Sequence, residues 1–539
     1  MSGRARAGLV RFGLGCGTFV LCAFGLDAGT AVAAASANPP PPGGKLTFDL
    51  NEIRVDGNTV LPSGVIEETV YPFLGPGKSA EDVERAREAL EEVYRQRGYP
   101  TVSARVPRQR VVGGVVTIAV VERKVERLRI TGARYFLPSD IREGAPSVAP
   151  GKVPNMQEVQ RDIVALNQLP DRTVIPSLRP GRTPDTVDVD LQVQDKLPLH
   201  GSLELNNRQS TSTKPLRLLA SLSYNNLWQR GDSASVTYQV APQNTSDANV
   251  VSASYLFRVP NSNVSLLASY LKSDSNVTAL GNTNVVGKGV IAGFRVLVPL
   301  GTAEAFIQSL SAGADYKHFI ENDRFGDTTS NAPVTYYPVT VTYEADWTNP
   351  GSLTDLTASA VLGIRGWGSD SVAFDTKRYD AVPNFAYLRL NLSHTETLDS
   401  DVQFYGNLIA QESNDALVSS EQLGAGGVDT VRGYLESEAL GDYGAIGQLE
   451  VRSPSLAGHI GGPVTSLRLH VFTDAGALGI RNALPGQTSS YTLASAGGGM
   501  RVQLYNHVNG SVEDAVVLTN GPSTRTGSNR VLFRIEGDF

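Results

Sequence analysis

The sequence is almost without cysteine. Its two cysteines, Cys16 and Cys22, both lie within residues 1–37, so the rest of the chain can form no disulfide of its own. Thiol catalysis and cysteine-based zinc sites are excluded there for the same reason. Long apolar runs are lacking too. After residue 37 no window has eighteen apolar residues in a row, which excludes a membrane-spanning helix. Only a closed β-barrel could then carry this part of the chain across a membrane.

Residues 1–37 have the composition of a bacterial secretory signal peptide. Arg4, Arg6 and Arg11 form a basic start, an apolar stretch runs from about Leu9 to Leu26, and small residues follow it. This order predicts export, with cleavage after Ala35 or, preferably, after Ala37. An N-terminal membrane anchor is the alternative, but the stretch is short and rich in glycine and alanine. Residues 38–45, which contain prolines and glycines, are expected to form a short extended linker.

Charge divides the exported chain into two parts. Residues 45–196 hold 22 basic and 22 acidic residues, whereas residues 197–539 hold 22 basic and 31 acidic residues over a much longer stretch. Neither part has a basic patch with interleaved aromatic residues. Nucleic acid is therefore not an expected partner.

The first part repeats itself, with Gly57 and Gly132 at equivalent places 75 residues apart. Each copy reads as a short strand, two helices and two strands, and each closes with a strand of alternating polarity. We therefore expect two α+β units, residues 46–122 and residues 123–196. The expected helix starts are Ser63 and Ser139 as N-caps of the first helices, and Ser79 with Asp82 and Asn155 with Glu158 as capping boxes of the second.

The second part alternates apolar and polar residues in runs of about ten, separated by clusters of Gly, Asn, Asp and Ser. This pattern is typical of a transmembrane antiparallel β-barrel, and at roughly 20 residues per strand and turn residues 197–539 give about 16 strands. A soluble β-sandwich is the alternative with the same period, but the signal peptide and the chain end favour the barrel. In the last segment, VLFRIEGDF, Phe539 is in phase with the apolar face of Val531, Phe533 and Ile535.

One connection, about residues 413–443, is far too long for a hairpin turn. It contains a single arginine, Arg432, with acidic residues on both sides. Farther on, in LRLHVFTDAG, the alternation places Leu469 and Val471 on the lipid face and Asp474 on the inward face. An inward carboxylate needs water or a cation, and an arginine offers a bidentate partner. A solvated loop arginine is the alternative interpretation of Arg432.

Glu450 and Arg452 fall on the inward face as well, if Leu449 and Val451 face lipid. Two interpretations stay open for this pair. The two side chains belong to one polar network in the lumen, or they merely line a wet pore.

The two α+β units resemble POTRA domains, which are modules of bacterial outer-membrane assembly and secretion proteins. Two such units, a barrel of this size and the long loop together resemble the two-partner secretion transporters, the haemolysin-activator and adhesin-exporter family of the POTRA-plus-barrel superfamily. The loop motif is Val431, Arg432, Gly433 and Tyr434, and the F-x-D-x-G strand motif is Phe472, Asp474 and Gly476. The resemblance implies that the loop folds back into the barrel lumen, where the two motifs meet. We therefore expect Arg432 to bind Asp474 inside the barrel.

The resemblance also implies a function. The protein would sit in the outer membrane of a Gram-negative bacterium with its POTRA domains in the periplasm. These domains would recognise an unfolded exoprotein that carries an N-terminal secretion domain, and the barrel would translocate it to the cell surface. The barrel assembly machinery would read Phe539 and insert the chain into the lipid bilayer. An assembly or insertion factor of the same superfamily is the alternative, although the main assembly factors carry more POTRA units.

No catalytic motif is found. The sequence has neither G-x-S-x-G nor H-E-x-x-H, and its six histidines are scattered, so we expect neither enzyme activity nor a metal or cofactor site. His470, inward beside Asp474, is interpreted as lining the lumen. Several members of the family carry an N-terminal helix that plugs the barrel. Here about ten residues separate Ala37 from Phe48, so we expect no plug helix.

Overall fold

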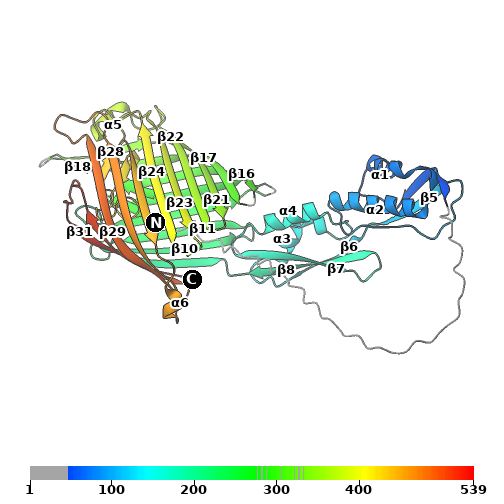
Figure 1. The fold of residues 1–539 in the computed structure, drawn as a ribbon. Helices are drawn as coiled ribbons and strands as arrows, with labels where there is room; N and C mark the ends of the chain where they lie inside the picture. Colours follow the sequence, from blue (N-terminus) through cyan, green and yellow to red (C-terminus); the bar gives the residue numbers. More distant parts are fainter. Residues whose placement is uncertain are drawn as a thin grey trace. The chain divides into compact units, whose positions relative to one another are not determined.

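The computed structural model describes residues 47–539, apart from residues 261, 276, 281–282, 287, 304, 321, 326–327 and 332. The predictions of a signal peptide, of a linker and of no plug helix all concern residues that lie outside the described ones. The described chain forms two compact units (Figure 1). The first ends at Leu197 and the second begins at Pro198. No helix among the described residues is long and apolar enough to span a membrane.

The first unit contains the repeat that the sequence predicts. In each copy a three-stranded sheet has a parallel pair and an antiparallel pair, in the orders β2-β5-β4 and β6-β8-β7. The elements of the first copy are β1 Phe48–Leu50, β2 Glu52–Asp56, α1 Ser63–Val70, η1 Tyr71–Phe73, β3 Gly75–Lys78, α2 Ala80–Gln96, β4 Ser103–Arg105 and β5 Val115–Val121. Those of the second are β6 Lys124–Thr131, α3 Pro138–Glu143, η2 Pro146–Val148, α4 Met156–Leu166, β7 Arg172–Pro180 and β8 Thr186–Asp195.

The two glycines that mark the repeat have the same physical role. Gly57 has φ +91° and Gly132 has φ +86°, where side chains are disfavoured. In both places a Cβ atom would lie 2.3 Å from a carbonyl oxygen of the last strand of the copy, that of Val120 or Val193. Strands β2 and β6 therefore leave their sheets at a point where only glycine fits.

The helix starts were predicted in part. Ser79 and Asp82 form the expected capping box, and Asn155 caps α4 through the amides of Gln157 and Glu158. Ser63 and Ser139 are not N-caps, since Pro62 and Leu137 occupy those positions. In α3 the cause is Pro138, whose fixed φ favours the first helical position and moves the cap to the residue before it.

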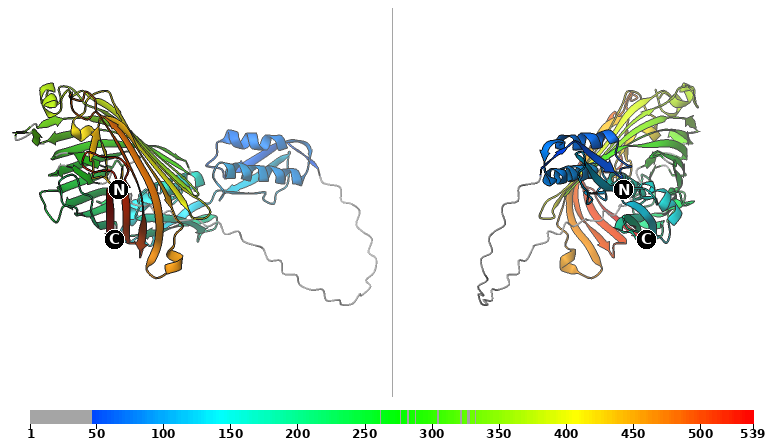
Figure 2. Two further views of the ribbon diagram at one scale, coloured as in Figure 1. Left: turned by 60° about the vertical axis from the view of Figure 1, so that its left-hand side comes forward. Right: turned by 90° about the vertical axis from the view of Figure 1, so that its right-hand side faces the viewer.

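The second unit is a closed antiparallel barrel whose strands are inclined round the wall (Figure 2). It has 16 strands when β20 and β21, which both pair with β17, are taken as one interrupted strand. The soluble sandwich is thereby excluded. The strands are β9 Leu199–Asn206, β10 Arg217–Leu227, β11 Asp232–Val240, β12 Asn249–Arg258, β13 Ser265–Ser273, β16 Gly289–Ala303, β17 Phe306–Phe319, β20 Val334–Tyr336, β21 Val339–Asn349, β22 Ser352–Leu362, β23 Ala386–Thr397, β24 Gln403–Ser413, β27 Tyr443–Arg452, β28 Val464–Gly479, β29 Ser490–Leu504, β30 Val508–Val517 and β31 Asn529–Asp538.

Short elements complete this unit at the ends of the strands. The hairpins β14–β15 (Val277–Leu280 and Thr283–Val286) and β18–β19 (Asn322–Phe325 and Thr328–Asn331) extend two connections. Helix α5, Ser371–Lys377, lies at one end of the barrel and helix α6, Ala457–Ile460, at the other (Figure 1).

The predicted alternation sets the two faces of the wall. On β28, Leu469 and Val471 are exposed on the outside, whereas Phe472 and Asp474 are buried inside. The outer face is therefore apolar and suits lipid, while the inner face holds the polar residues. At the end of β31, Phe539 follows the outward phase and is exposed.

Candidate functional site

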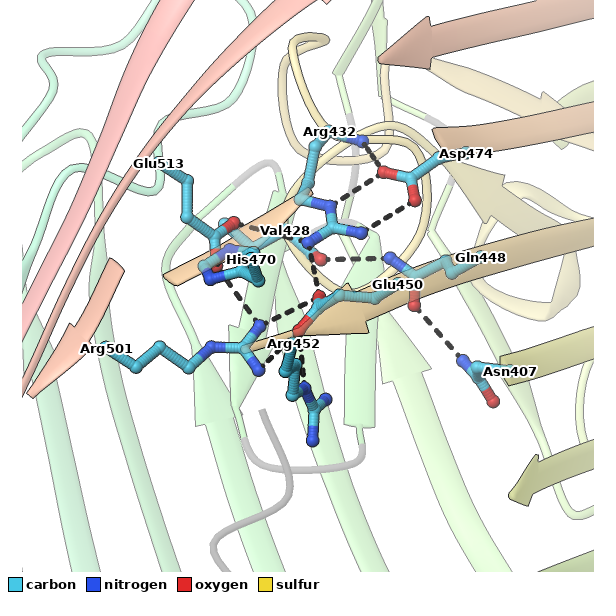
Figure 3. Close-up of polar contacts among 10 residues, drawn as sticks. All are labelled: Asn407, Val428, Arg432, Gln448, Glu450, Arg452, His470, Asp474, Arg501 and Glu513. Atoms are coloured by element: carbon cyan, nitrogen blue, oxygen red, sulfur yellow. Dashed lines mark hydrogen bonds and ion pairs between the residues drawn. The ribbon is translucent and has the colours of Figure 1, made fainter. Parts of the chain in front are cut away.

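The long loop between β24 and β27, residues 414–442, folds into the barrel. It contains η3 Ser419–Glu421 and a short ladder formed by β25 Leu423–Ala425 and β26 Ala439–Gly441. Its side chains contact inward-facing residues of β27, β28 and β30, and Figure 3 shows the charged groups that meet there. The loop and the strands together line a polar cavity of about 1030 Å³.

Arg432 and Asp474 form the ion pair that we expect from the sequence. The guanidinium donates from Nε to Oδ2 and from Nη2 to Oδ1 of Asp474, each at 2.8 Å. The backbone amide of Arg432 donates to Oδ2 as well, at 3.0 Å. Arg432 is 2% exposed and Asp474 is 1% exposed, so both partners of the contact are buried. A planar fork on a carboxylate is the geometry that arginine can make and lysine cannot.

The guanidinium of Arg432 also stacks on the ring of Phe472, with its central carbon 3.4 Å from the ring centroid. Gly476 leaves room for the loop, since a Cβ atom there would lie 3.3 Å from a methyl group of Val431. The three positions of the strand motif therefore act on the loop motif through charge, ring face and free space.

The other two loop-motif residues fix the backbone around Arg432. Gly433 has φ +93°, and a Cβ atom there would lie 3.1 Å from Val517. The buried hydroxyl of Tyr434 donates to the carbonyl of Thr519 at 2.6 Å, beyond the end of β30. Together they turn the chain so that Arg432 points at β28.

Glu450 and Arg452 both belong to this network and do not merely line the pore. Arg432 Nη1 donates to Glu450 at 2.9 Å, and Arg452 donates to the other oxygen of Glu450 at 2.6 Å. Two further residues, Glu513 and Arg501, complete the group, with Arg501 between Glu450 and Glu513. The cluster thus holds three arginines and three carboxylates, whose formal charges cancel, and His470 lies 3.2 Å from Glu513.

Sequence reasoning missed a second arginine that holds the loop. Arg208, just after β9, is buried and donates to Glu436 at 2.8 Å and to Asp429 at 2.6 Å. These carboxylates flank Arg432 on either side along the loop. Arg208 lies more than two hundred residues away in the sequence, and no local pattern marks it. The only available signal was the excess of acidic residues around Arg432, which requires cations from elsewhere.

Among the described residues, no group of three or more His, Cys, Asp or Glu side chains has a geometry that could hold a metal ion. The charged cluster around Arg432 is held together by ion pairs. It can hold the loop in the lumen, and it can release the loop if those ion pairs break.

Known proteins resemble the chain in both units. Residues 185–502 match the family model of the haemolysin secretion/activation protein ShlB/FhaC/HecB, and residues 48–123 match the model of the ShlB-type POTRA domain. The outer membrane transporter CdiB of Dickeya dadantii (strain 3937) is 23% identical over 406 residues, which are 74% of this chain and 71% of that protein. The CdiB transporter of Escherichia coli O6:K15:H31 is 25% identical over 408 residues, which are 74% of this chain and 67% of that protein.

Solved structures share the fold. CdiB from Escherichia coli matches with a TM-score of 0.64 at 23% identity, over 93% of both chains. CdiB from Acinetobacter baumannii matches with a TM-score of 0.58 at 16% identity, over 92% of this chain and 90% of that one. BamA from Haemophilus ducreyi, without its POTRA domains 1–3, matches at 0.54 and 15% identity, over 91% of this chain and all of the other. At these identities the likeness to solved structures concerns the fold alone.

The family model covers more than half of the chain, and the resemblance inferred from the motifs is confirmed. The chain therefore belongs to the haemolysin secretion/activation protein family ShlB/FhaC/HecB, as an outer-membrane transporter of the two-partner secretion type with its POTRA domains in the periplasm.

Proposed function

We propose that this chain transports an unfolded exoprotein through the barrel when the loop 414–442 leaves its docked position. The observation that carries the proposal is the buried contact between Arg432 and Asp474, which holds the loop across the lumen. A loop held by buried ion pairs has two defined states, because the pairs are either made or replaced by water. The docked state described above is the resting state of the transporter.

The POTRA domains offer edges on which an extended polypeptide can bind. Among the described residues β7 pairs only with β8, at the edge of its sheet, and its Ile175 is exposed. An unfolded chain could add to such an edge through backbone hydrogen bonds and insert alternate side chains into apolar contacts. We propose that the exoprotein is captured in this way before it enters the barrel.

The periplasm supplies no nucleotide, so the energy for transport comes from folding of the exoprotein or from its capture at the cell surface. We further propose that the barrel assembly machinery recognises β31 and its exposed Phe539 when it inserts the chain into the lipid bilayer. No catalytic step is part of this proposal, in keeping with a family of transporters. The chain therefore recognises and moves a substrate without changing it chemically.

Comparison of the proteins exported by cells with and without this chain tests the proposal. Loss of one large exported protein from the medium and the cell surface, with the other outer-membrane barrels unchanged, is the expected result. Cells with the Arg432→Ala chain should show the same loss although the barrel is present in the membrane. Depletion of several unrelated outer-membrane barrels would instead identify an assembly factor and overturn the transporter mechanism.

A further inference from the structure

The loop 414–442 consists of three parts. We call residues 415–422 together with Asp442 the base, the pair β25 and β26 the neck, and residues 426–438 the tip. Arg432 belongs to the tip, which binds the inner wall through the contacts described above. The base is held by a different set of residues.

Asp442 is the centre of the base and is fully buried. Its carboxylate accepts hydrogen bonds from both terminal nitrogens of Arg378, one of them at 2.6 Å. Arg378 lies in the extracellular segment 363–385 between β22 and β23. It also accepts the amides of Leu417 at 3.0 Å and Arg481 at 2.7 Å. One carboxylate therefore ties both ends of the loop to two neighbouring extracellular connections.

Glu421 fixes the base to the wall. It is 1% exposed and accepts Lys317 Nζ at 2.6 Å, the hydroxyl of Tyr336 at 2.6 Å and the hydroxyl of Tyr387 at 2.8 Å. These partners lie on β17, β20 and β23. Arg432, by contrast, binds β27, β28 and β30. The loop is thus anchored to two separate parts of the wall.

Apolar packing holds both the base and the tip, but on different partners. Leu417 and Val418 are buried in one cluster with Phe374 and Phe385 of the segment 363–385. The base also makes a β-bridge to that segment, between Ala416 and Ala381. In the tip, Val431 and Tyr434 are buried against residues of the wall such as Val517. The base differs because it shares its apolar cluster and its β-bridge with the segment 363–385, so its release would also detach that extracellular segment.

The backbone has positive φ angles where the neck meets the tip. Gly426 has φ +109°, Gly427 has φ +104°, and Ser437, which donates its amide to Gly426 across the neck, has φ +47°. Three left-handed residues at one junction permit large changes of chain direction with little steric cost at the glycines. Small residues at such junctions are common at hinges.

We propose that Glu421 and Asp442 are positioning residues that keep the base in place during transport, so that the lumen opens by movement of the tip about the junction at Gly426 and Gly427. This inference rests on the proposed function, and it specifies which part of the loop moves. The base stays attached to the segment 363–385, and the ion pairs of Arg432 and Arg208 break.

Two disulfide staples distinguish this motion from release of the whole loop, because the exported chain has no cysteine of its own. Ala381→Cys with Ala416→Cys staples the base at its β-bridge, where paired residues lie within the span of a disulfide. Val431→Cys with Gly476→Cys staples the tip, where a Cβ atom on residue 476 would lie 3.3 Å from the Val431 side chain. Each staple can be compared in its oxidised and reduced forms in the same membrane.

Conductance in planar bilayers with potassium chloride as the probe gives the first readout. In the Arg432→Ala background, which frees the tip, the oxidised base staple should leave the raised conductance unchanged. The oxidised tip staple should return it to the value of the unmodified chain, and reduction should raise it again. A fall of conductance on closing the base staple would overturn the inference, because opening would then require the base to move.

Secretion gives the second readout in the chain that keeps Arg432. The oxidised base staple should secrete within about two-fold of its reduced form, and the oxidised tip staple should secrete none. A block by the base staple overturns the inference. If neither redox form of either staple exports anything although the barrel is inserted, the proposed function fails, and conductance still decides which part of the loop moves.

Rescue of secretion by the base staple distinguishes a positioning role of Asp442 from a general structural role. Asp442→Ala should lower secretion by loosening the base, and the oxidised base staple should restore it because a covalent link then replaces the carboxylate. Asp399→Ala, at an exposed aspartate in another connection, is the matched control and should have no effect. Failure of the staple to restore secretion, with normal barrel insertion, would refute the positioning role of Asp442.

Discussion

Replacement of Arg432 by alanine should release the loop tip, and the structure allows the size of the effect to be derived. Asp474 would lose its two guanidinium bonds, and the cluster would change from three carboxylates with three arginines to three with two. Glu450 and Glu513 would keep Arg501, whereas Asp474 would have no cation in place of Arg432. Removal of one partner from a buried ion pair costs about 3–5 kcal/mol, which shifts the docked-to-undocked ratio by roughly 100-fold or more.

Chemical labelling can measure this shift. Thr430→Cys places a single thiol in the tip at a buried position, and its rate of reaction with a maleimide in outer-membrane vesicles reports the fraction of undocked loop. We expect the rate to rise by about two orders of magnitude in Arg432→Ala. Arg432→Lys should give an intermediate rate, because an ammonium cannot make the planar fork. Arg525→Ala, at an exposed loop arginine, is the matched control and should leave the rate unchanged.

The double variant provides the refutation. Arg432→Ala with Asp474→Ala removes both charges and leaves the remaining carboxylates and arginines of the cluster in equal number. Its labelling rate should therefore not exceed that of the faster single variant, and the two effects should not add. Additive effects, or a labelling rate in Arg432→Ala equal to that of the parent chain, would show that the ion pair does not hold the loop.

Three further outcomes are expected. Deletion of the loop 414–442 should raise the conductance of the barrel in planar bilayers, whereas an unchanged value would place the loop outside the ion path. Deletion of residues 47–122 should abolish export and leave a heat-modifiable barrel in the outer membrane, and continued export would show that recognition lies elsewhere. Hydrogen bonds from the backbone and side chain of Ser79 lower the pKa of Asp82 from 3.8 to about 2. Because the folded pKa lies below the unfolded one, this contribution to stability is present above about pH 4 and is lost as the pH falls toward 2. Hydrogen exchange in the first turn of α2 should show this loss, and Asp82→Asn should remove the dependence on pH.

Features that depend on local spacing can be predicted from the amino-acid sequence. An alternation of period two fixed which side chains of β28 face lipid, since successive residues of a strand point to opposite faces. The glycine spacing identified the repeat, because Gly57 and Gly132 stand where a Cβ atom would meet a carbonyl oxygen. The capping box of α2 was also evident, since Ser79 and Asp82 satisfy each other within one turn. Ser63 and Ser139 were misassigned as caps because the flanking prolines and cap geometry, rather than residue preference, decided where those helices begin.

Most of the contacts that hold the loop could not be predicted from the sequence, because they form only in the folded barrel. Barrel closure brings the end of β9 to the loop, so that Arg208 reaches Glu436 across 228 positions of sequence. Closure also gathers Arg432, Glu450, Arg501 and Glu513 from a loop and three strands into one neutral cluster. The base follows the same rule, since Asp442 and Glu421 take their cations from Arg378 and Lys317 on other connections and strands. A buried charge requires a partner of opposite charge nearby. The closed barrel, and not a local sequence pattern, determines which residues of the chain become such partners.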